Sequence, residues 1–148
     1  MSFFEQGQRV YHRNNQMATG EVLEVVKVGE YSHAYVVKMD NGRPNETFDE
    51  FDALALPTVG KGATIHSGSD RYPATIVKVT GSQVHARQDI AEPAEGHDYY
   101  NGQKYTYRPD PEAPVKVFRK NKHGRYQASG GYPKLSIGIR SRYEDPSF

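Results

Sequence analysis

The chain contains no cysteine and no long apolar run. The absence of cysteine excludes disulfides, thiolate nucleophiles, iron–sulfur clusters and Cys-ligated zinc, and it fits a reducing compartment. The apolar runs are a few residues long, whereas a membrane-spanning helix takes about 20, and the first residues lack the basic start and apolar stretch of a signal peptide. With a mean hydropathy of −0.81, the sequence predicts a cytoplasmic protein without a membrane partner.

Sequence motifs of the common enzyme classes are also missing. There is no Gly-x-Ser-x-Gly elbow, no phosphate-binding Gly-x-x-x-x-Gly-Lys-Ser/Thr loop and no Gly-x-Gly-x-x-Gly after a strand. The six histidines are scattered and never form His-x-x-x-His, so no metal site is expected. The acidic run of Asp49, Glu50 and Asp52 is open to two interpretations, a divalent-cation site or a solvated helix start. We expect no enzyme, no cofactor, no metal and no small-molecule substrate.

Glycine, proline and tyrosine are abundant, at 14, 9 and 11 residues, and apolar spacing of period 3.6 is nearly absent. This pattern predicts short strands and turns. Residues 22–28 and 35–39 form a predicted hairpin, and Asp40-Asn41-Gly42 is a strong turn signal because Asn-Gly tolerates positive φ. One helical turn is predicted at 47–54, where Thr47 and Glu50 form a capping box.

An internal repeat appears at an offset of 54 residues, with His12 placed on His66. The next strand matches when the intervening loop is shortened by five residues. A chance match between two β segments of similar pattern is the alternative interpretation. The aligned segments are 10–12 with 64–66, 20–25 with 74–79, and 35–40 with 84–89.

Segments 7–11, 18–25 and 35–42 follow the order strand, loop, Gly-x-Val, long strand, hairpin. This order resembles the Tudor, KOW and other SH3-like small barrels. The resemblance implies an all-β fold of two tandem small SH3-like barrels, an acidic unit at 1–57 and a basic unit at 58–148. Because such barrels bind DNA, RNA, peptides or other proteins, the resemblance implies no single function.

The second half extends beyond the repeat. Strands are predicted at 104–108 and 115–120, and a hairpin turn at 121–124 leads to 125–128. The second barrel is thus enlarged by an extra hairpin and followed by an extended arm at 140–148. Segments 62–66, 69–75 and 143–148 are similar to small uncharacterised proteins of tailed bacteriophages. This resemblance implies a phage or bacterial origin, and the cytoplasm of a bacterial host cell if the chain is phage-encoded, but no particular activity.

Charge is unevenly distributed along the chain. Residues 1–57 carry five Lys/Arg and nine Asp/Glu, a net of −4, and residues 58–148 carry fourteen and nine, a net of +5. Strand alternation predicts that Val115 and Val117 point inward and that Lys116, Phe118 and Lys120 point outward. Cations beside exposed aromatics are typical of nucleic-acid contact, although they also occur on plain solvated strands. The predicted contact residues are Lys104, Tyr105, Tyr107, Arg108, Lys116, Phe118, Arg119, Lys120, Lys122 and Arg125.

The sequence therefore predicts a non-enzymatic binding module that engages nucleic acid, or a nucleic-acid-handling host protein, through its basic half. The alternative is a protein-interaction or virion-associated structural module, in which complementary acidic and basic faces assemble a homo-oligomer. The repeat places His12 and His66 at equivalent strand ends, where each is interpreted as a histidine hydrogen-bonded to a loop.

Overall fold

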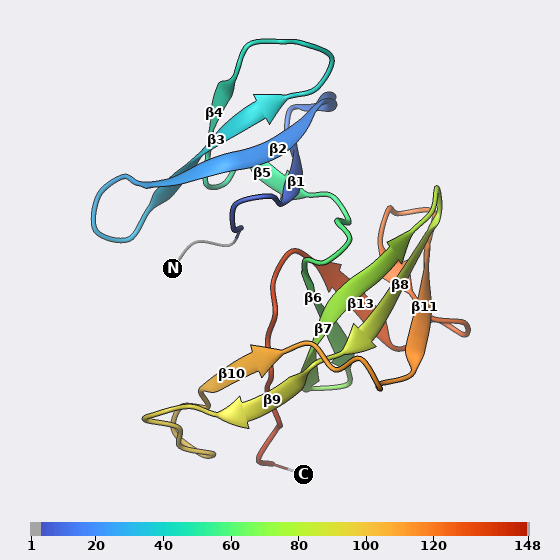
Figure 1. Ribbon diagram of the computed structural model, residues 1–148. Helices are drawn as coiled ribbons and strands as arrows, with labels where there is room; N and C mark the ends of the chain where they lie inside the picture. Colours follow the sequence, from blue (N-terminus) through green and yellow to red (C-terminus); the bar gives the residue numbers. More distant parts are fainter. Residues whose placement is uncertain (1–3, 148) are drawn as a thin grey trace. The chain divides into compact units, whose positions relative to one another are not determined.

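The computed structural model describes residues 4–147 of the chain. The chain divides into two compact units, unit 1 (Met1–Thr58) and unit 2 (Val59–Phe148), and the sequence places this boundary one residue earlier. All regular structure in the described residues is β-structure, as Figure 1 shows for each unit. The prediction of an all-β chain is confirmed.

Within residues 4–147 the two units contain thirteen strands, five in unit 1 and eight in unit 2. They are β1 (Arg9–His12), β2 (Asn15–Lys27), β3 (His33–Met39), β4 (Glu46–Asp49), β5 (Ala53–Ala55), β6 (Gly62–Ser67), β7 (Asp70–Val79), β8 (Gln83–Gln88), β9 (Ile90–Pro93), β10 (Tyr105–Arg108), β11 (Val115–Lys120), β12 (Tyr126–Gln127) and β13 (Lys134–Ile137).

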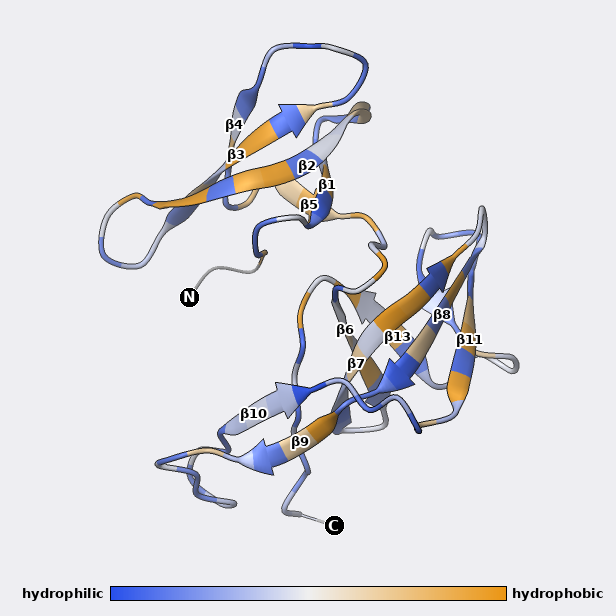
Figure 2. Cartoon of the chain, viewed as in Figure 1, coloured by the Kyte–Doolittle hydropathy of each residue, from blue (hydrophilic) through white to orange (hydrophobic). Residues whose placement is uncertain are grey.

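Unit 1 is a five-stranded antiparallel sheet with the order β4-β3-β2-β1-β5. The predicted hairpin is confirmed, because β2 pairs with β3 along its length. Alternate residues of these strands, among them Val22, Tyr35 and Val37, pack into one apolar core with Phe48, and Figure 2 shows the apolar stretches on β2 and β3. The hydrogen-bonded order ends at β4 and β5, so this unit is an open sheet and not a closed barrel.

The turn after β3 has the predicted chemistry. Asn41 and Gly42 have φ angles of 62° and 72°, and the Arg43 amide approaches the Asp40 carbonyl at 3.5 Å. Two successive positive φ angles define a type I′ arrangement, which asparagine followed by glycine adopts at little cost.

The predicted helical turn at 47–54 is wrong. The segment forms edge strand β4, a tight turn closed by the Asp52 amide on the Asp49 carbonyl, and β5. Phe48 is buried opposite Tyr35, whereas Phe51 is 73% exposed. Phe48 and Phe51, which are spaced by three residues, therefore do not share one apolar face. Pairing of this segment with β3 stabilises it more than a short isolated helix would, because such a helix is marginally stable in water.

Unit 2 contains a closed barrel with the order β11-β12-β13-β6-β7-β8, and β9 and β10 form a separate two-stranded ribbon. The predicted hairpin turn at 121–124 is confirmed, since Asn121 donates its amide to the Arg125 carbonyl at 2.8 Å. The core includes Ile65, Ile76 and Phe118. Barrel closure leaves β11 and β13 paired on both sides through β12.

The two units pair corresponding strands in the same order, because β11-β8-β7-β6-β13 in unit 2 parallels β4-β3-β2-β1-β5 in unit 1. The long strands carry a bulge at corresponding places, after Val22 in β2 and after Ile76 in β7. Buried phenylalanines Phe48 and Phe118 occupy the strand next to β3 and β8 respectively. Unit 2 differs by the inserted β9-β10 ribbon and by β12, which closes its barrel.

Candidate nucleic-acid interface

Strand β11 has the opposite phase to the one predicted. Phe118 is fully buried opposite Val84, whereas Val115 and Val117 are 42% and 39% exposed. Side chains of a strand alternate between faces, so the face shared by Lys116, Phe118 and Lys120 is the barrel interior. Only Phe118 lies at the centre, and both lysines are exposed. Phe118 is therefore a core residue, and its predicted role in base stacking is wrong.

The predicted contact residues on β10 lie on the other side of unit 2 from β11, as Figure 1 shows. Tyr105 donates its hydroxyl to Gln103 at 3.1 Å, and the Tyr107 hydroxyl accepts the Arg142 amide at 3.1 Å. Arg108 is paired with Glu92 at 2.9 Å. The two tyrosines are half-buried and engaged within the unit, so they do not extend the β11 surface. Lys104 is exposed in the loop before β10.

A row of outward side chains crosses four neighbouring strands of the barrel. Arg119 of β11 lies opposite Gln127 of β12, Gln127 lies opposite Lys134 of β13, and Lys134 lies opposite His66 of β6. Directly opposed residues share a face, and the buried neighbours Phe118 and Leu135 show that this face is the outer one.

Further cations lie at the tip of the β11-β12 hairpin, beside this row. Lys122 and Arg125 are exposed, and the Asn121 Oδ1 atom accepts the amides of His123 and Arg125 at 2.9 and 3.0 Å. These hydrogen bonds hold the tip in one conformation. We define the basic face as the exposed cations of this region, which are Arg119, Lys120, Lys122, Arg125 and Lys134.

A polar hollow of about 350 Å³ opens on the basic face. Arg119 and Lys120 supply its charge, and Gln127, Ser129 and Gly130 supply polar and backbone groups. Tyr132, in the loop that joins β12 to β13, is 68% exposed, and the Lys134 ammonium lies 5.2 Å from its ring centroid. The face thus combines cations with one accessible aromatic ring.

No carboxylate from the same stretch of chain opposes these cations. Residues 113–141 contain seven Lys/Arg and no Asp or Glu. His66 is the member of the row on β6, and its pKa is lowered because burial disfavours the imidazolium and Arg71 adds a like charge. Near neutral pH the positive charge of the row therefore comes from Arg119 and Lys134.

Four of the ten predicted residues, Arg119, Lys120, Lys122 and Arg125, belong to the basic face, and Lys116 lies on the same strand. Sequence reasoning missed Tyr132 and Lys134. The available signal was the same run of cations without acidic residues, which continues past β12 to Lys134.

The C-terminal arm, residues 140–147, packs on the rest of unit 2, and its first residue pairs with a buried carboxylate. Arg140 donates from Nε to Asp89 at 2.9 Å and from a terminal nitrogen to Thr75 at 3.1 Å. Thr75 also donates to Asp89 at 2.6 Å. The Asp89 carboxylate is fully buried, so this triad is the charge compensation that a buried carboxylate requires.

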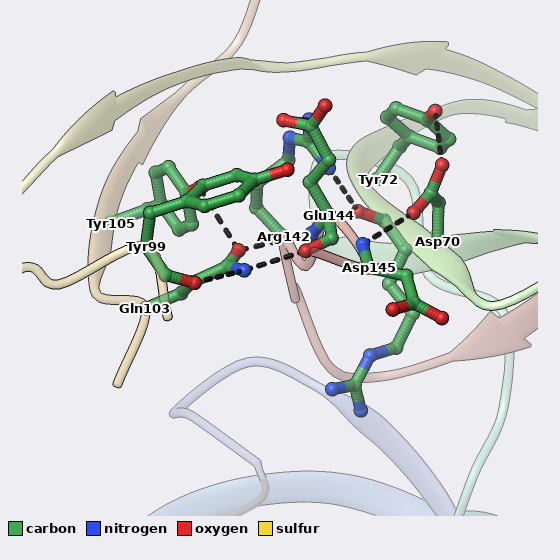
Figure 3. Close-up of polar contacts among 9 residues, drawn as sticks. Asp70, Tyr72, Tyr99, Gln103, Tyr105, Arg142, Glu144 and Asp145 are labelled. Carbon is green, nitrogen blue, oxygen red and sulfur yellow. Dashed lines mark hydrogen bonds and ion pairs between the residues drawn. The ribbon is translucent and has the colours of Figure 1, made fainter. Parts of the chain in front are cut away.

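Residues 142–145 of the arm contact β7, β10 and the loop before β10, as Figure 3 shows. The Arg142 guanidinium lies 4.8 Å from the ring centroid of Tyr72 and 5.9 Å from that of Tyr105. Tyr143 and Arg71 exchange two backbone hydrogen bonds of 2.8 and 2.9 Å. The arm is thus held by backbone pairing together with cation–π contacts.

The two histidines singled out in the sequence do not correspond in the pairing registers. Val10 lies opposite Gly20, and Ala63 lies opposite Ala74, so the counterpart of His12 is Ile65. His12 accepts the Asn14 amide on Nδ1 at 3.1 Å and has Nε2 3.8 Å from Asp52. His66 shares a 2.8 Å hydrogen bond with Ser136.

Within the described residues, no group of three or more His, Cys, Asp or Glu side chains is arranged to hold a metal ion. Between residues 4 and 147 there is also no helix with the length and apolar character needed to span a bilayer. Comparison of the chain with protein-family models, with curated proteins and with solved structures gives no match.

Proposed function

We propose that the chain is a non-enzymatic module that binds nucleic acid through the basic face of unit 2. The main support is the alignment of Arg119, Gln127 and Lys134 across three paired strands. These residues lie in a stretch of 29 residues, 113–141, that contains seven cations and no acidic residue. Lysine and arginine neutralise backbone phosphates and release counterions, which drives binding independently of sequence.

The geometry supports different roles for different groups on the basic face. Tyr132 stacks on a base, the hollow beside Arg119 admits a phosphate or sugar, and phosphates are contacted by the five cations Arg119, Lys120, Lys122, Arg125 and Lys134. Tyr132 thereby replaces Tyr105 and Tyr107, whose hydroxyls are engaged within the unit.

We also propose that the two units are tandem copies of one SH3-like plan, the second closed into a barrel by β12. The matching strand orders and the bulges after Val22 and Ile76 support this interpretation. In this view the basic face is a property of the second copy alone, because the added strand β12 and the β11-β12 turn create it.

The test is the salt dependence of binding to a fluorescently labelled single strand of 30 nucleotides, measured by anisotropy. Five phosphate contacts predict a slope of about −3.5 in log K against log salt, or roughly a hundredfold loss of affinity between 50 and 200 mM. The variant R119E/K120E/K122E/R125E should lose binding, and the matched unit 1 variant K27E/K38E should retain it. Absence of binding at 50 mM salt, or binding by the fourfold variant equal to wild type, contradicts the proposal.

Protein assembly is the second candidate, and the opposite net charges of residues 1–58 and 59–148, −4 and +5, favour it. Complementary charge steers association and is screened by salt. This function predicts a molar mass in light scattering that rises with concentration at low salt and falls in 0.5 M salt. A constant monomer mass at low salt contradicts self-assembly.

A further inference from the structure

The C-terminal arm binds unit 2 in the way that a peptide ligand binds a protein. Residues 142–145 use six backbone groups, and each of them meets a group outside the arm. We call the receiving residues the arm site. They are Asp70, Arg71, Tyr72, Gln103, Tyr105 and Tyr107.

The backbone contacts follow one another residue by residue. The Arg142 amide donates to Tyr107, Tyr143 pairs with Arg71 in both directions, and the Glu144 amide and carbonyl both meet the Gln103 side chain, at 3.0 and 2.6 Å. The Asp145 amide donates to Asp70 Oδ1 at 2.7 Å. Backbone hydrogen bonds to an extended segment are the basis of peptide capture by strand addition.

Side chains add sequence selectivity to this backbone capture. The Arg142 guanidinium occupies a position between Tyr72 and Tyr105, and the Tyr143 ring lies 5.1 Å from the Arg71 guanidinium. Figure 3 shows Gln103 between Tyr99 and Glu144, where it is oriented by a hydrogen bond to the Tyr99 carbonyl at 3.1 Å. The side-chain contacts of the arm at this site thus come from an arginine followed by an aromatic residue.

No side chain of residues 142–145 is fully buried. The Arg142 side chain is 19% exposed, but it is charged, and Tyr143, the one aromatic residue of this segment, is only half-buried. Glu144 is exposed, whereas Arg140 is tied to the buried Asp89. Segments that bury little apolar surface open at a lower free energy than the core. The arm can consequently leave its site beyond Ser141 while Arg140 stays in place.

We propose that the arm site is a binding site for an extended peptide in trans, and that its occupant is the arm of a second copy of this chain. A second copy carries the segment that already matches the site, and exchange of identical elements is a low-cost route to a dimer. A net charge of +1 leaves little repulsion between copies. The chain's own arm competes at a high effective concentration, so exchange rises with protein concentration.

The experiment uses a fluorescent peptide of residues 141–147 and three full-length proteins. The variant R142A/Y143A weakens the arm and keeps the arm site, the variant Q103A weakens the site and keeps the arm, and Q127A on β12 is the matched control. The peptide should bind R142A/Y143A about tenfold more tightly than it binds wild type or Q127A, because the internal competitor is weakened. It should bind Q103A most weakly.

Self-association provides the second measurement, by sedimentation velocity from low to high concentration. Wild type and Q127A should form a dimer, whereas R142A/Y143A and Q103A should each remain monomeric alone and form a heterodimer when mixed. Failure of the peptide to bind R142A/Y143A that retains the wild-type circular dichroism spectrum overturns the peptide site. Peptide binding together with a monomeric wild type at every concentration overturns the second copy as occupant.

Discussion

Replacing Phe118 distinguishes the two possible phases of β11. In the structure its ring is fully buried opposite Val84, within the core that contains Ile65 and Ile76. Loss of a buried phenylalanine ring costs about 3–5 kcal/mol, from lost transfer free energy and from the cavity that remains. Since whole proteins are stable by only about 5–15 kcal/mol, F118A should unfold much of unit 2.

A milder substitution makes this effect measurable. F118L preserves an apolar side chain and should cost about 1 kcal/mol, which lowers the urea midpoint by about 0.5–1 M when the slope is about 1–2 kcal/mol per M. The matched control V117A removes methyl groups from a partly exposed side chain and should change stability by about 0.5 kcal/mol or less.

The assay is urea unfolding by far-ultraviolet circular dichroism, with hydrogen exchange of β7 and β8 to assign the change to unit 2. F118L should retain nucleic-acid binding at low urea, because its side chain lies inside the barrel. An outward Phe118 requires the opposite result, unchanged stability in F118A together with weakened binding. That result would refute the assignment of Phe118 to the core.

The remaining predictions concern two carboxylates that pair with arginine, Asp40 in unit 1 and Asp89 in unit 2. Hydrogen bonds from Arg9 and then Thr19 lower the pKa of Asp40 to about 2. The contribution of Asp40 to the stability of unit 1 is therefore complete above the ordinary pKa of 3.8 and is lost as the pH falls through 2. Acid titration of unit 1 unfolding should show this loss in wild type and not in D40N. In unit 2, R140A leaves the buried Asp89 carboxylate without its cation and should destabilise by about 3–5 kcal/mol, whereas R142A, beyond the triad, should cost about 1 kcal/mol or less by thermal unfolding.

Local sequence signals predicted the elements whose partners lie close in the chain. The hairpin of β2 and β3 follows from β-branched residues, and the turn at Asn41 and Gly42 follows from the positive φ that both residues tolerate. The phase of β11 could not be obtained in this way, because Val-Lys-Val-Phe-Arg-Lys offers an apolar residue to either face. Pairing with Val84, 34 residues earlier, decides which face is buried.

The candidate sites depend on partners that are still more distant in sequence. The outward row joins Arg119, Lys134 and His66 through barrel closure, and no local pattern places these residues side by side. The arm was predicted as an extended segment, but its contact between Arg142 and Tyr72 joins residues from opposite ends of unit 2. Charge composition located the region, and pairing register selected its residues.

Each unit pairs an aspartate with an arginine, but the arginine comes from a different part of the chain in each unit. Asp40 follows β3, and Asp89 follows β8, which holds the same place in unit 2. The backbone amide of each aspartate donates a hydrogen bond to the neighbouring long strand, β2 in unit 1 and β7 in unit 2. In unit 1 the partner is Arg9 of the first strand, and the registers place Gly62 at the corresponding position of unit 2.

A side chain at Gly62 would collide with Arg140, because a Cβ atom there would lie 2.6 Å from the Arg140 Cγ atom. The arm's first residue therefore supplies the guanidinium that the first strand of unit 2 lacks. Arg140 is consequently part of the fold of unit 2, whereas residues 142–145 contribute no such core group. Arg140 thus anchors the arm to unit 2, and residues 142–145 form the segment that is available for exchange between copies.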